Sequence, residues 1–384
     1  MGCAQSISNQ FNEVSSKEPW KDWSAHPVHQ KYKCGHKLGA GAFSQVHHAT
    51  HLKSSEQAAI KIVFKERPGL KKKYIQVLRN EVAVLRALNH PNIIGLKGVL
   101  EDDHQIAIIL ERVHGPEMQK HLDKVGHYTE DRAGHIFYQV AQAVHHMHME
   151  GYIHRDLKPE NLLFVEAPSR DPEEKLTIKL IDMGMSLKFD PDTNVSGALG
   201  TPGYLAPEAR DMKPHTYVMD VWSLGVILFQ MLRGKMPFTK AQIKKFLYTT
   251  IDIPRTAAFK ARTGNQKEFT ADLEDLLTKM LQLQPQARPD TREILEHPWV
   301  AKYAPRGYLS NLQTGPTELR TGSTTGGKSG IDLRNNSVSG YGSLTNKAYL
   351  AATQLSPTGG SNVNITPRCG SGLLHGRIGF GEGR

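Results

Sequence analysis

The residues best suited to chemistry lie in two short stretches, 154–161 (His-Arg-Asp-Leu-Lys-Pro-Glu-Asn) and 182–184 (Asp-Met-Gly). Transfer of a phosphoryl group needs a carboxylate near the acceptor hydroxyl, a cation on the transferring phosphate and oxygen ligands for Mg²⁺. The chain offers these in Asp156, in Lys158, and in the pair Asn161 and Asp182. Because Mg²⁺ keeps several of its waters, two side chains together with phosphate oxygens suffice to hold it. The two stretches therefore predict phosphoryl transfer.

Two earlier motifs could hold a nucleotide. The turn at 39–46 (Gly-Ala-Gly-Ala-Phe-Ser-Gln-Val) lies between expected strands, and its glycines let backbone amides approach a polyphosphate where a Cβ would collide. Alone it is weak evidence, because glycine-rich hairpins are common. Lys61 ends an apolar strand, and a buried ammonium needs anionic partners such as phosphate oxygens or Glu81. Taken singly, Lys61 fits a surface lysine at the end of a strand better than a phosphate ligand; its spacing from the turn and from Glu81 makes it informative.

The elements that must position these motifs form two unlike halves. Up to about residue 112 the sequence favours short strands with one helix of three-to-four apolar spacing, and beyond Pro116 it is chiefly helical. The early strands are expected at 32–38, 44–50 and 57–63, and the early helix at 73–88. The clearest later helices are expected at 130–149, 218–232 and 272–281. We therefore predict an α+β architecture with a small sheet lobe followed by a larger helical lobe.

Composition divides the 384 residues into three zones. Residues 1–31 form an arm without a sustained hydrophobic period, and residues 32–300 carry the periodic segments. From 301 to 384 the chain is rich in Gly, Ser and Thr, and such a segment cannot bury enough apolar surface to offset its ordering entropy. We expect this tail to be disordered.

Charge and cysteine content exclude several classes of protein. The net charge is +10, and residues 305–384 contribute eight Lys or Arg against three Asp or Glu. The tail lacks the interleaved aromatic residues of a nucleic-acid module, so no nucleic-acid partner is expected. The longest apolar stretch, 221–232, is too short to span a bilayer. Three widely spaced cysteines cannot build a disulfide framework, which fits a reducing compartment.

Over residues 32–300, the motifs and their order resemble those of a eukaryotic protein serine/threonine kinase. The resemblance implies a two-lobed protein kinase fold, with an antiparallel-sheet N-lobe (32–112) and a helical C-lobe (113–300), that binds ATP and Mg²⁺. The implied nucleotide-binding residues are Leu38, Gly39, Gly41, Val46, Ala59, Lys61, Glu81, Glu111, Val113 and Leu163. The implied metal ligands are Asn161 and Asp182. The implied catalytic residues are Asp156, Lys158 and Thr201, with Thr201 bridging the other two.

The resemblance also indicates the acceptor. Lys158 and the stretch 200–208 (Gly-Thr-Pro-Gly-Tyr-Leu-Ala-Pro-Glu) are similar to those of serine/threonine rather than tyrosine kinases. Glu117 and Glu160 match positions that contact basic residues upstream of the acceptor, so an Arg three residues before the target Ser or Thr is expected. Glu208 and Arg288 match the family's buried ion pair. The sequences at 90–93 (His-Pro-Asn-Ile) and 296–299 (Glu-His-Pro-Trp) resemble the calcium/calmodulin-dependent kinase group.

Two departures from the family pattern leave alternatives open. Met183 replaces the usual Phe, and its apolar bulk is expected to pack in the same place. Gly197 occupies the position where related kinases often carry an activating Thr or Ser; Ser196 is adjacent to it and Thr193 lies nearby. Either Ser196 is phosphorylated in a shifted register, giving Arg155 a negative partner, or the loop orders without phosphate. A catalytically silent scaffold is the alternative to an active enzyme, although every charged catalytic residue is retained.

The N-terminus predicts a lipid anchor. Residues 1–6 (Met-Gly-Cys-Ala-Gln-Ser) fit N-myristoylation at Gly2, and palmitoylation of Cys3 would add the second acyl chain that stable anchoring requires. We therefore expect a cytoplasmic protein tethered to the cytoplasmic face of a membrane. Calmodulin control is not supported, because no clear basic amphipathic helix follows Trp299. The nucleotide-loop match at 322–329 has neither the strand nor the helix it needs, so it is read as coincidence.

Overall fold

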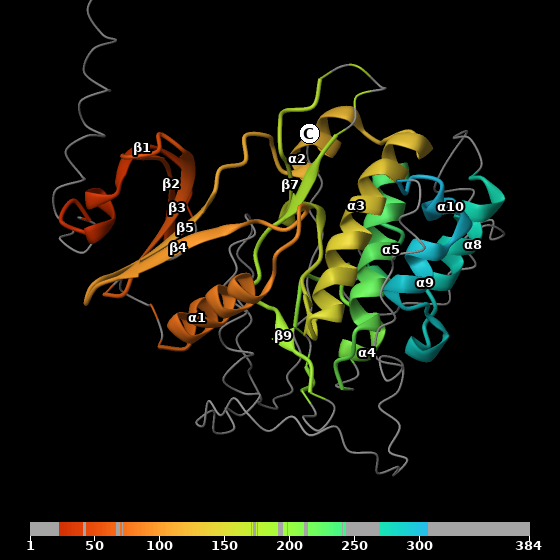
Figure 1. Ribbon diagram of the computed structural model, residues 1–384. Helices are drawn as coiled ribbons and strands as arrows, with labels where there is room; N and C mark the ends of the chain where they lie inside the picture. The colour runs from red at the N-terminus through yellow and green to blue at the C-terminus, as the bar shows by residue number, and fades with distance from the viewer. Residues whose placement is uncertain are drawn as a thin grey trace, which may run out of the picture.

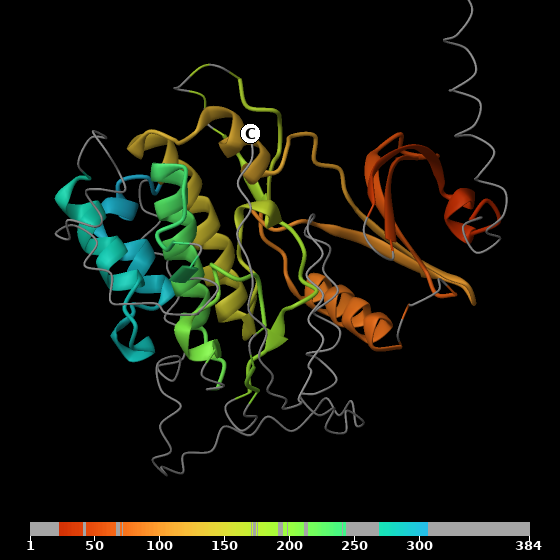
Figure 2. The ribbon, with the colours of Figure 1, turned by 180° about the vertical axis from the view of Figure 1, so that it is seen from behind.

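The computed structural model describes residues 23–305 except 41–43, 67–69, 71, 170, 172–173, 175, 191–194, 198, 211–213, 240 and 243–268. These residues form a sheet lobe and a helical lobe joined side by side (Figure 1). The same separation of strands from helices is seen from behind (Figure 2). The predicted two-lobed α+β fold is confirmed.

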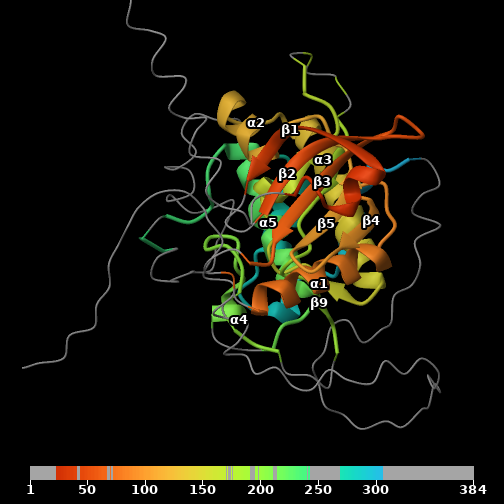
Figure 3. The same ribbon diagram turned by 90° about the vertical axis from the view of Figure 1, so that its left-hand side faces the viewer.

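The small lobe is built on a five-stranded sheet of order β1-β2-β3-β5-β4, in which all neighbours are antiparallel. Figure 3 looks onto this sheet with the helical lobe behind it. Its strands are β1 (Tyr32–Ala40), β2 (Ser44–His51), β3 (Gln57–Phe64), β4 (Leu96–Glu101) and β5 (Gln105–Glu111). The first three strands lie where the sequence predicts them, and β1 runs two residues further because Ala40 still pairs with Gln45.

Helix α1 (Lys72–Ala87) covers one face of this sheet. Its Leu78 and Val82 pack against Val63 of β3 and against Ile106 and Ile108 of β5. The helix therefore lies within one residue of its predicted bounds at each end, because its apolar spacing matches the surface it buries.

The opposite face of the sheet is covered in part by the N-terminal arm. The described part of that arm contains the 3₁₀ helix η3 (Pro27–Gln30), whose Val28 is fully buried among residues of the sheet. The imidazole of His26 caps this turn by accepting a hydrogen bond from the amide of Val28. The arm thus joins the small lobe from residue 23 onward, which hydrophobic periodicity alone does not reveal.

The large lobe is a helical core around α3 (Glu130–Met149) and α5 (Val218–Arg233). Every residue of α5 is buried, so this helix has no face exposed to solvent. The other elements are α2 (Met118–Val125), α4 (Pro207–Arg210), α8 (Ala271–Met280), η5 (Pro285–Ala287), α9 (Thr291–Glu296) and α10 (Pro298–Ala301). Among the described residues, no helix is both long enough and apolar enough to cross a bilayer.

Four short strands hold the loops that carry the chemistry. They are β6 (Tyr152–Ile153), which pairs with β9 (Leu187–Lys188), and β7 (Leu162–Phe164), which pairs with β8 (Ile178–Leu180). The loop 154–158 and the 3₁₀ turn η4 (Pro159–Asn161) connect β6 to β7. The segment 181–186 connects β8 to β9, so the two ladders bring residues 154–161 and 182–184 together.

Candidate active site

Lys61 on β3 is held by a carboxylate from α1. Its Nζ lies 2.8 Å from Oε1 and 2.8 Å from Oε2 of Glu81. Burial opposes the charged form, but the carboxylates of Glu81 and Asp182 outweigh it, so the pKa of Lys61 is raised. The ammonium therefore stays charged.

The carboxylate of Asp156 is held on both oxygens. Thr201 donates to Oδ1 through its hydroxyl (2.7 Å) and its amide (2.9 Å), and Lys158 Nζ lies 2.8 Å from Oδ2. Lys158 Nζ also lies 2.8 Å from Oγ1 of Thr201, so the threonine hydroxyl stands between the other two groups. This carboxylate therefore has one orientation, fixed by two segments far apart in the sequence.

Asn161 and Asp182 lie at the same end of the β7–β8 ladder, in which Leu162 is opposite Leu180. The Nδ2 of Asn161 donates to the backbone carbonyl of Asp156 (2.8 Å), and the amide of Ile181 donates to the carbonyl of Asn161 (2.9 Å). Asp182 has a φ of 64°, an uncommon value for a residue with a side chain, and its Oδ1 accepts from the amide of Gly184 (3.1 Å). The pair offers an amide oxygen and a carboxylate, the donor types that hard divalent cations bind.

The part of the chain that the structure describes contains no cluster of three His, Cys, Asp or Glu that could hold a metal by itself. Two oxygen ligands from the protein fit a cation that is also bound by phosphates and water. Histidines 145, 146 and 148, on the helix before the catalytic loop, do not form such a cluster either. Instead, His145 Nδ1 contacts Thr291 Oγ1 at 3.0 Å.

The residues expected to hold the nucleotide lie on adjoining strands. Gly39 on β1 is opposite Val46 on β2, which is opposite Lys61 on β3. Among the residues that the structure describes, a Cβ at Gly39 would meet no atom within 4 Å, so their packing does not require a glycine there and leaves space for a ligand. Leu38 precedes Gly39 on the same strand, and Gly41 lies outside the described residues.

The base-binding positions continue onto β5 and β7. Ala59 on β3 is opposite Leu110, the residue before Glu111. The carboxylate of Glu111 is occupied within the protein, because it accepts from the amide of Gly95 (2.8 Å) and pairs with Lys179 (2.6 Å). Its side chain is therefore not free to contact a base, and its backbone amide donates to the carbonyl of Gly95 (2.9 Å). Two further positions follow: Val113 is buried just after β5, and Leu163 on β7 bridges to Glu117.

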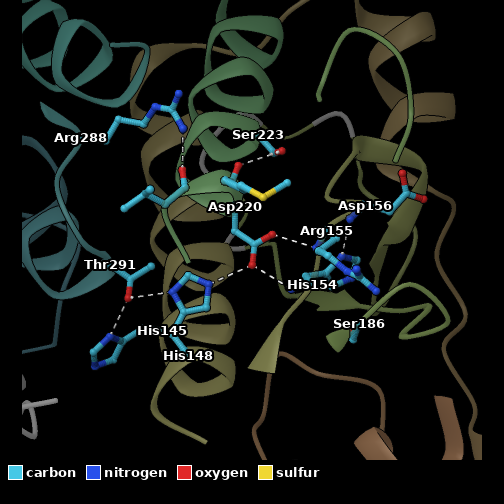
Figure 4. Close-up of polar contacts among 12 residues, drawn as sticks. His145, His148, His154, Arg155, Asp156, Ser186, Asp220, Ser223, Arg288 and Thr291 are labelled. Atoms are coloured by element: carbon cyan, nitrogen blue, oxygen red, sulfur yellow. Dashed lines mark hydrogen bonds and ion pairs between the residues drawn. The ribbon is translucent and has the colours of Figure 1, made fainter. Parts of the chain in front are cut away.

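Asp220, which the sequence motifs did not single out, anchors the catalytic loop (Figure 4). Its Oδ2 accepts from the amide of His154 (2.8 Å) and its Oδ1 from the amide of Arg155 (2.9 Å), while His148 Nε2 lies 2.9 Å from Oδ2. Burial opposes ionisation, but these hydrogen bonds outweigh it and hold the pKa of Asp220 below its usual value. The signal available in the sequence was a lone acid in the apolar run of α5.

The 183–186 segment is tied to α1. Met183 is fully buried in the core that also contains Leu85, and its Sδ accepts from the hydroxyl of Ser186 (3.7 Å). Asn80 on α1 donates to the carbonyl of Ser186 (2.8 Å). The methionine thus occupies a buried apolar position, as its bulk suggests.

The two carboxylates expected to face a substrate differ in their surroundings. Glu117, just before α2, pairs with Lys120 on that helix (2.7 Å), so its charge is already partly matched. Oε2 of Glu160 is buried and makes no hydrogen bond with any residue that the structure describes. Glu160 therefore has more to gain than Glu117 from contact with a cation.

The remaining predictions divide between described and undescribed residues. Glu208 and Arg288 form a buried pair, with Nη1–Oε1 at 2.6 Å and Nη2–Oε2 at 2.8 Å. Ser196 makes an isolated β-bridge with Pro214. Gly2, Cys3, Thr193 and the 322–329 stretch lie outside the described residues.

Comparison with known proteins agrees with this geometry. Residues 32–300 match the family model described as "Protein kinase domain". The chain is 35% identical over 288 residues to "Calcium/calmodulin-dependent protein kinase type 1" of Macrobrachium nipponense. The aligned region covers 75% of this chain and 80% of the relative. It is 34% identical over 270 residues to "Calcium/calmodulin-dependent protein kinase type 1B" of Rattus norvegicus, covering 70% of this chain and 75% of the relative.

A plant protein is similar over a comparable region. "Calcium-dependent protein kinase 14" of Arabidopsis thaliana is 34% identical over 286 residues, or 73% of this chain and 51% of the relative. The chain therefore spans about half the length of that plant relative.

Proposed function

The chain belongs to the protein kinase family, among the ATP-dependent serine/threonine kinases, and we propose that it phosphorylates proteins at a Ser or Thr that has an Arg upstream. In this proposal the reaction uses Mg²⁺ and takes place at a membrane surface. The observation that carries the proposal is the carboxylate of Asp156, held by Thr201 and Lys158 beside Asn161 and Asp182. Each charged group that phosphoryl transfer requires is present and oriented.

In this proposal Asp156 receives the acceptor hydroxyl. Its orientation is set by Thr201 and Lys158, so a hydroxyl placed against the carboxylate can give up its proton as the bond to phosphorus forms. Lys158 contacts the same carboxylate and would also contact the transferring phosphate. Its positive charge would stabilise the negative charge that develops on the phosphate in the transition state. Catalysis by these residues is mainly positioning and electrostatic stabilisation.

Two further groups would orient the nucleotide. Lys61, whose ammonium is fixed by Glu81, would contact the phosphates that stay behind. Asn161 and Asp182 would hold Mg²⁺, which neutralises charge on the phosphates when bound. Gly39 leaves the space beside β1 open to the phosphates.

The proposed Arg preference rests mainly on Glu160. A buried carboxylate oxygen without a hydrogen-bond partner among the described residues is costly, and a substrate guanidinium would supply charge-assisted hydrogen bonds. Glu117 would contribute less, because Lys120 already occupies its carboxylate.

The enzymatic proposal is tested with the full-length protein. Phosphate incorporation from Mg-ATP into an Arg-x-x-Ser peptide should exceed that of Asp156→Asn by about 10²- to 10⁴-fold. A peptide with Ala in place of Arg tests the substrate preference. Transfer by the wild-type protein no greater than that of Asp156→Asn would favour the alternative, a silent kinase-fold scaffold.

Membrane attachment is proposed from the sequence of the first six residues. Myristate on Gly2 and palmitate on Cys3 would together anchor the chain at the cytoplasmic face of a membrane, since one acyl chain binds only weakly. Gly2→Ala should move the protein from the membrane fraction to the soluble fraction, and Cys3→Ser should weaken retention. Unchanged retention of Gly2→Ala would remove this part of the proposal. We do not propose calmodulin as a partner.

A further inference from the structure

Arg155, next to the catalytic aspartate, is a buried cation with an unusual partner. Its guanidinium Nη1 lies 3.3 Å from Nδ1 of His215, and its Nε donates to the carbonyl of Met185 (2.7 Å). Arg155 and His215 are each only 4% exposed. The backbone of Arg155 has a φ of 68°, so the position is also conformationally strained. The histidine ring therefore offers an acceptor to this buried guanidinium.

The other ring nitrogen of His215 contacts the segment between Asp182 and Glu208, which we call the activation segment. Nε2 lies 2.8 Å from the carbonyl oxygen of Gly197, and the amide of His215 donates to the carbonyl of Val195 (2.8 Å). The neighbouring Pro214 forms a β-bridge with Ser196. Backbone and side chain of the 214–215 segment thus fix residues 195–197 in place.

The partners determine the proton on the ring. A guanidinium can only donate, so Nδ1 of His215 must accept, and a carbonyl can only accept, so Nε2 must carry the hydrogen. His215 therefore bridges Arg155 and Gly197 as a neutral imidazole. Burial and the charge of Arg155 lower its pKa to about 4, against the opposing effects of the Gly197 carbonyl and of Asp220.

This bridge is close to the catalytic carboxylate. Gly200 has a φ of +121°, and a Cβ there would lie 2.6 Å from the carbonyl oxygen of Arg155, so the segment passes directly over the backbone of the catalytic loop. The next residue, Thr201, reaches Asp156. The segment is therefore fixed at two points, by His215 near Gly197 and by Asp156 at Thr201.

We propose that His215 is a positioning residue that, through Arg155 and Gly197, orders the activation segment for catalysis without a phosphate on it. Of the two arrangements that the sequence leaves open, this one gives Arg155 a neutral acceptor in place of a phosphorylated Ser196. The inference rests on the proposed kinase activity.

The first test removes phosphate. The full-length protein and the double variant S196A/T193A are treated with phosphatase, and mass spectrometry verifies that residues 182–208 carry no phosphate. Both proteins should keep kcat for the Arg-x-x-Ser peptide within about threefold of the untreated wild type, because the bridge needs no phosphate. Activity that disappears only on phosphatase treatment would overturn the inference. An untreated wild type that transfers no phosphate would instead overturn the proposed function on which it rests.

The second test removes the bridge. His215→Phe keeps the bulk but loses both hydrogen bonds, and it should lower kcat by about 10- to 100-fold, since small misplacements near the reacting groups are costly. The KM for ATP should stay within about twofold, because the Lys61–Glu81 pair is untouched. His215→Gln, which retains one donor and one acceptor, should recover much of the loss.

A double-mutant cycle separates this role from a merely structural one. If His215 acts through Arg155, the double variant R155M/H215F should be no slower than the slower of the two single variants. Additive losses, or wild-type kcat in His215→Phe, would overturn the inference. Circular dichroism on each variant shows whether it is folded. If His215→Phe does not fold, the phosphatase test and His215→Gln still decide the matter.

Discussion

The guanidinium of Arg288 and the carboxylate of Glu208 form a two-pronged ion pair in the interior of the large lobe, with Nη1–Oε1 and Nη2–Oε2 distances of 2.6 and 2.8 Å. Their side chains are 0% and 3% exposed, respectively. Arg288 Nη1 also donates to the carbonyl of Val218 at the start of α5 (3.0 Å). The pair therefore ties the end of the activation segment to the helix that anchors the catalytic loop.

Glu208→Gln should destabilise the protein by about 3–5 kcal/mol, because it leaves a buried guanidinium without its charge partner. Equilibrium unfolding in urea measures this free energy. The matched control is Glu296→Gln, which breaks an exposed pair with Arg292 and should cost less than about 1 kcal/mol. Equal losses in the two variants would contradict the prediction.

Asp220→Asn should slow catalysis although it touches no substrate. The amide of the new side chain cannot accept from both backbone amides and from His148, so one buried donor loses its partner. We expect kcat to fall about 10²-fold. Steady-state kinetics with the Arg-x-x-Ser peptide measures it. Thr278→Ala, which removes a distant hydroxyl–carbonyl hydrogen bond, is the control and should keep the wild-type kcat.

Glu160→Gln should weaken recognition of the upstream Arg. Neutralising this carboxylate removes a charge-assisted contact, so the KM for the Arg-x-x-Ser peptide should rise about 10-fold while the KM for the Ala-substituted peptide stays unchanged. Lys120→Met, which frees the carboxylate of Glu117, should act in the opposite direction. A Glu160→Gln variant that loses activity equally on both peptides would contradict a role in this contact.

Stability should fall as the pH drops from about 7 toward about 4. Burial lowers the pKa of His90 and of His145 to about 4 from an ordinary 6.5, so the unfolded chain takes up protons that the folded chain refuses. Unfolding therefore becomes easier in acid. Urea midpoints at pH 7.5 and 5.0 measure the loss, which His145→Gln should reduce.

His104 is the control for this pH dependence. Its exposed ring contacts Glu66, and this partner raises its pKa, so its contribution to stability grows in acid rather than shrinking. His104→Asn should therefore leave the acid loss as large or slightly larger. A midpoint independent of pH in the wild-type protein would show that the buried histidines titrate as they do in the unfolded chain.

Residues close together in the sequence could be placed before the structure was known. Strand β3 and helix α1 follow from local apolar spacing, and the ends predicted for α1 are off by one residue because terminal turns depend on packing. The family resemblance, carried by motifs of fixed local spacing, predicted the contact between Lys61 and Glu81. The same holds for the short distances among Asp156, Lys158 and Thr201.

Other features needed the folded chain. No sequence motif indicates the docking of residues 23–30 on the sheet or the pairing of Glu117 with Lys120. The same is true of the anchoring of the catalytic loop by Asp220. Local sequence determined which chemical groups this protein carries and which strands and helices present them. Tertiary packing alone decided that His215 contacts Arg155. The two buried side chains are sixty residues apart in the sequence, so their contact depends on how the elements of the helical lobe pack together.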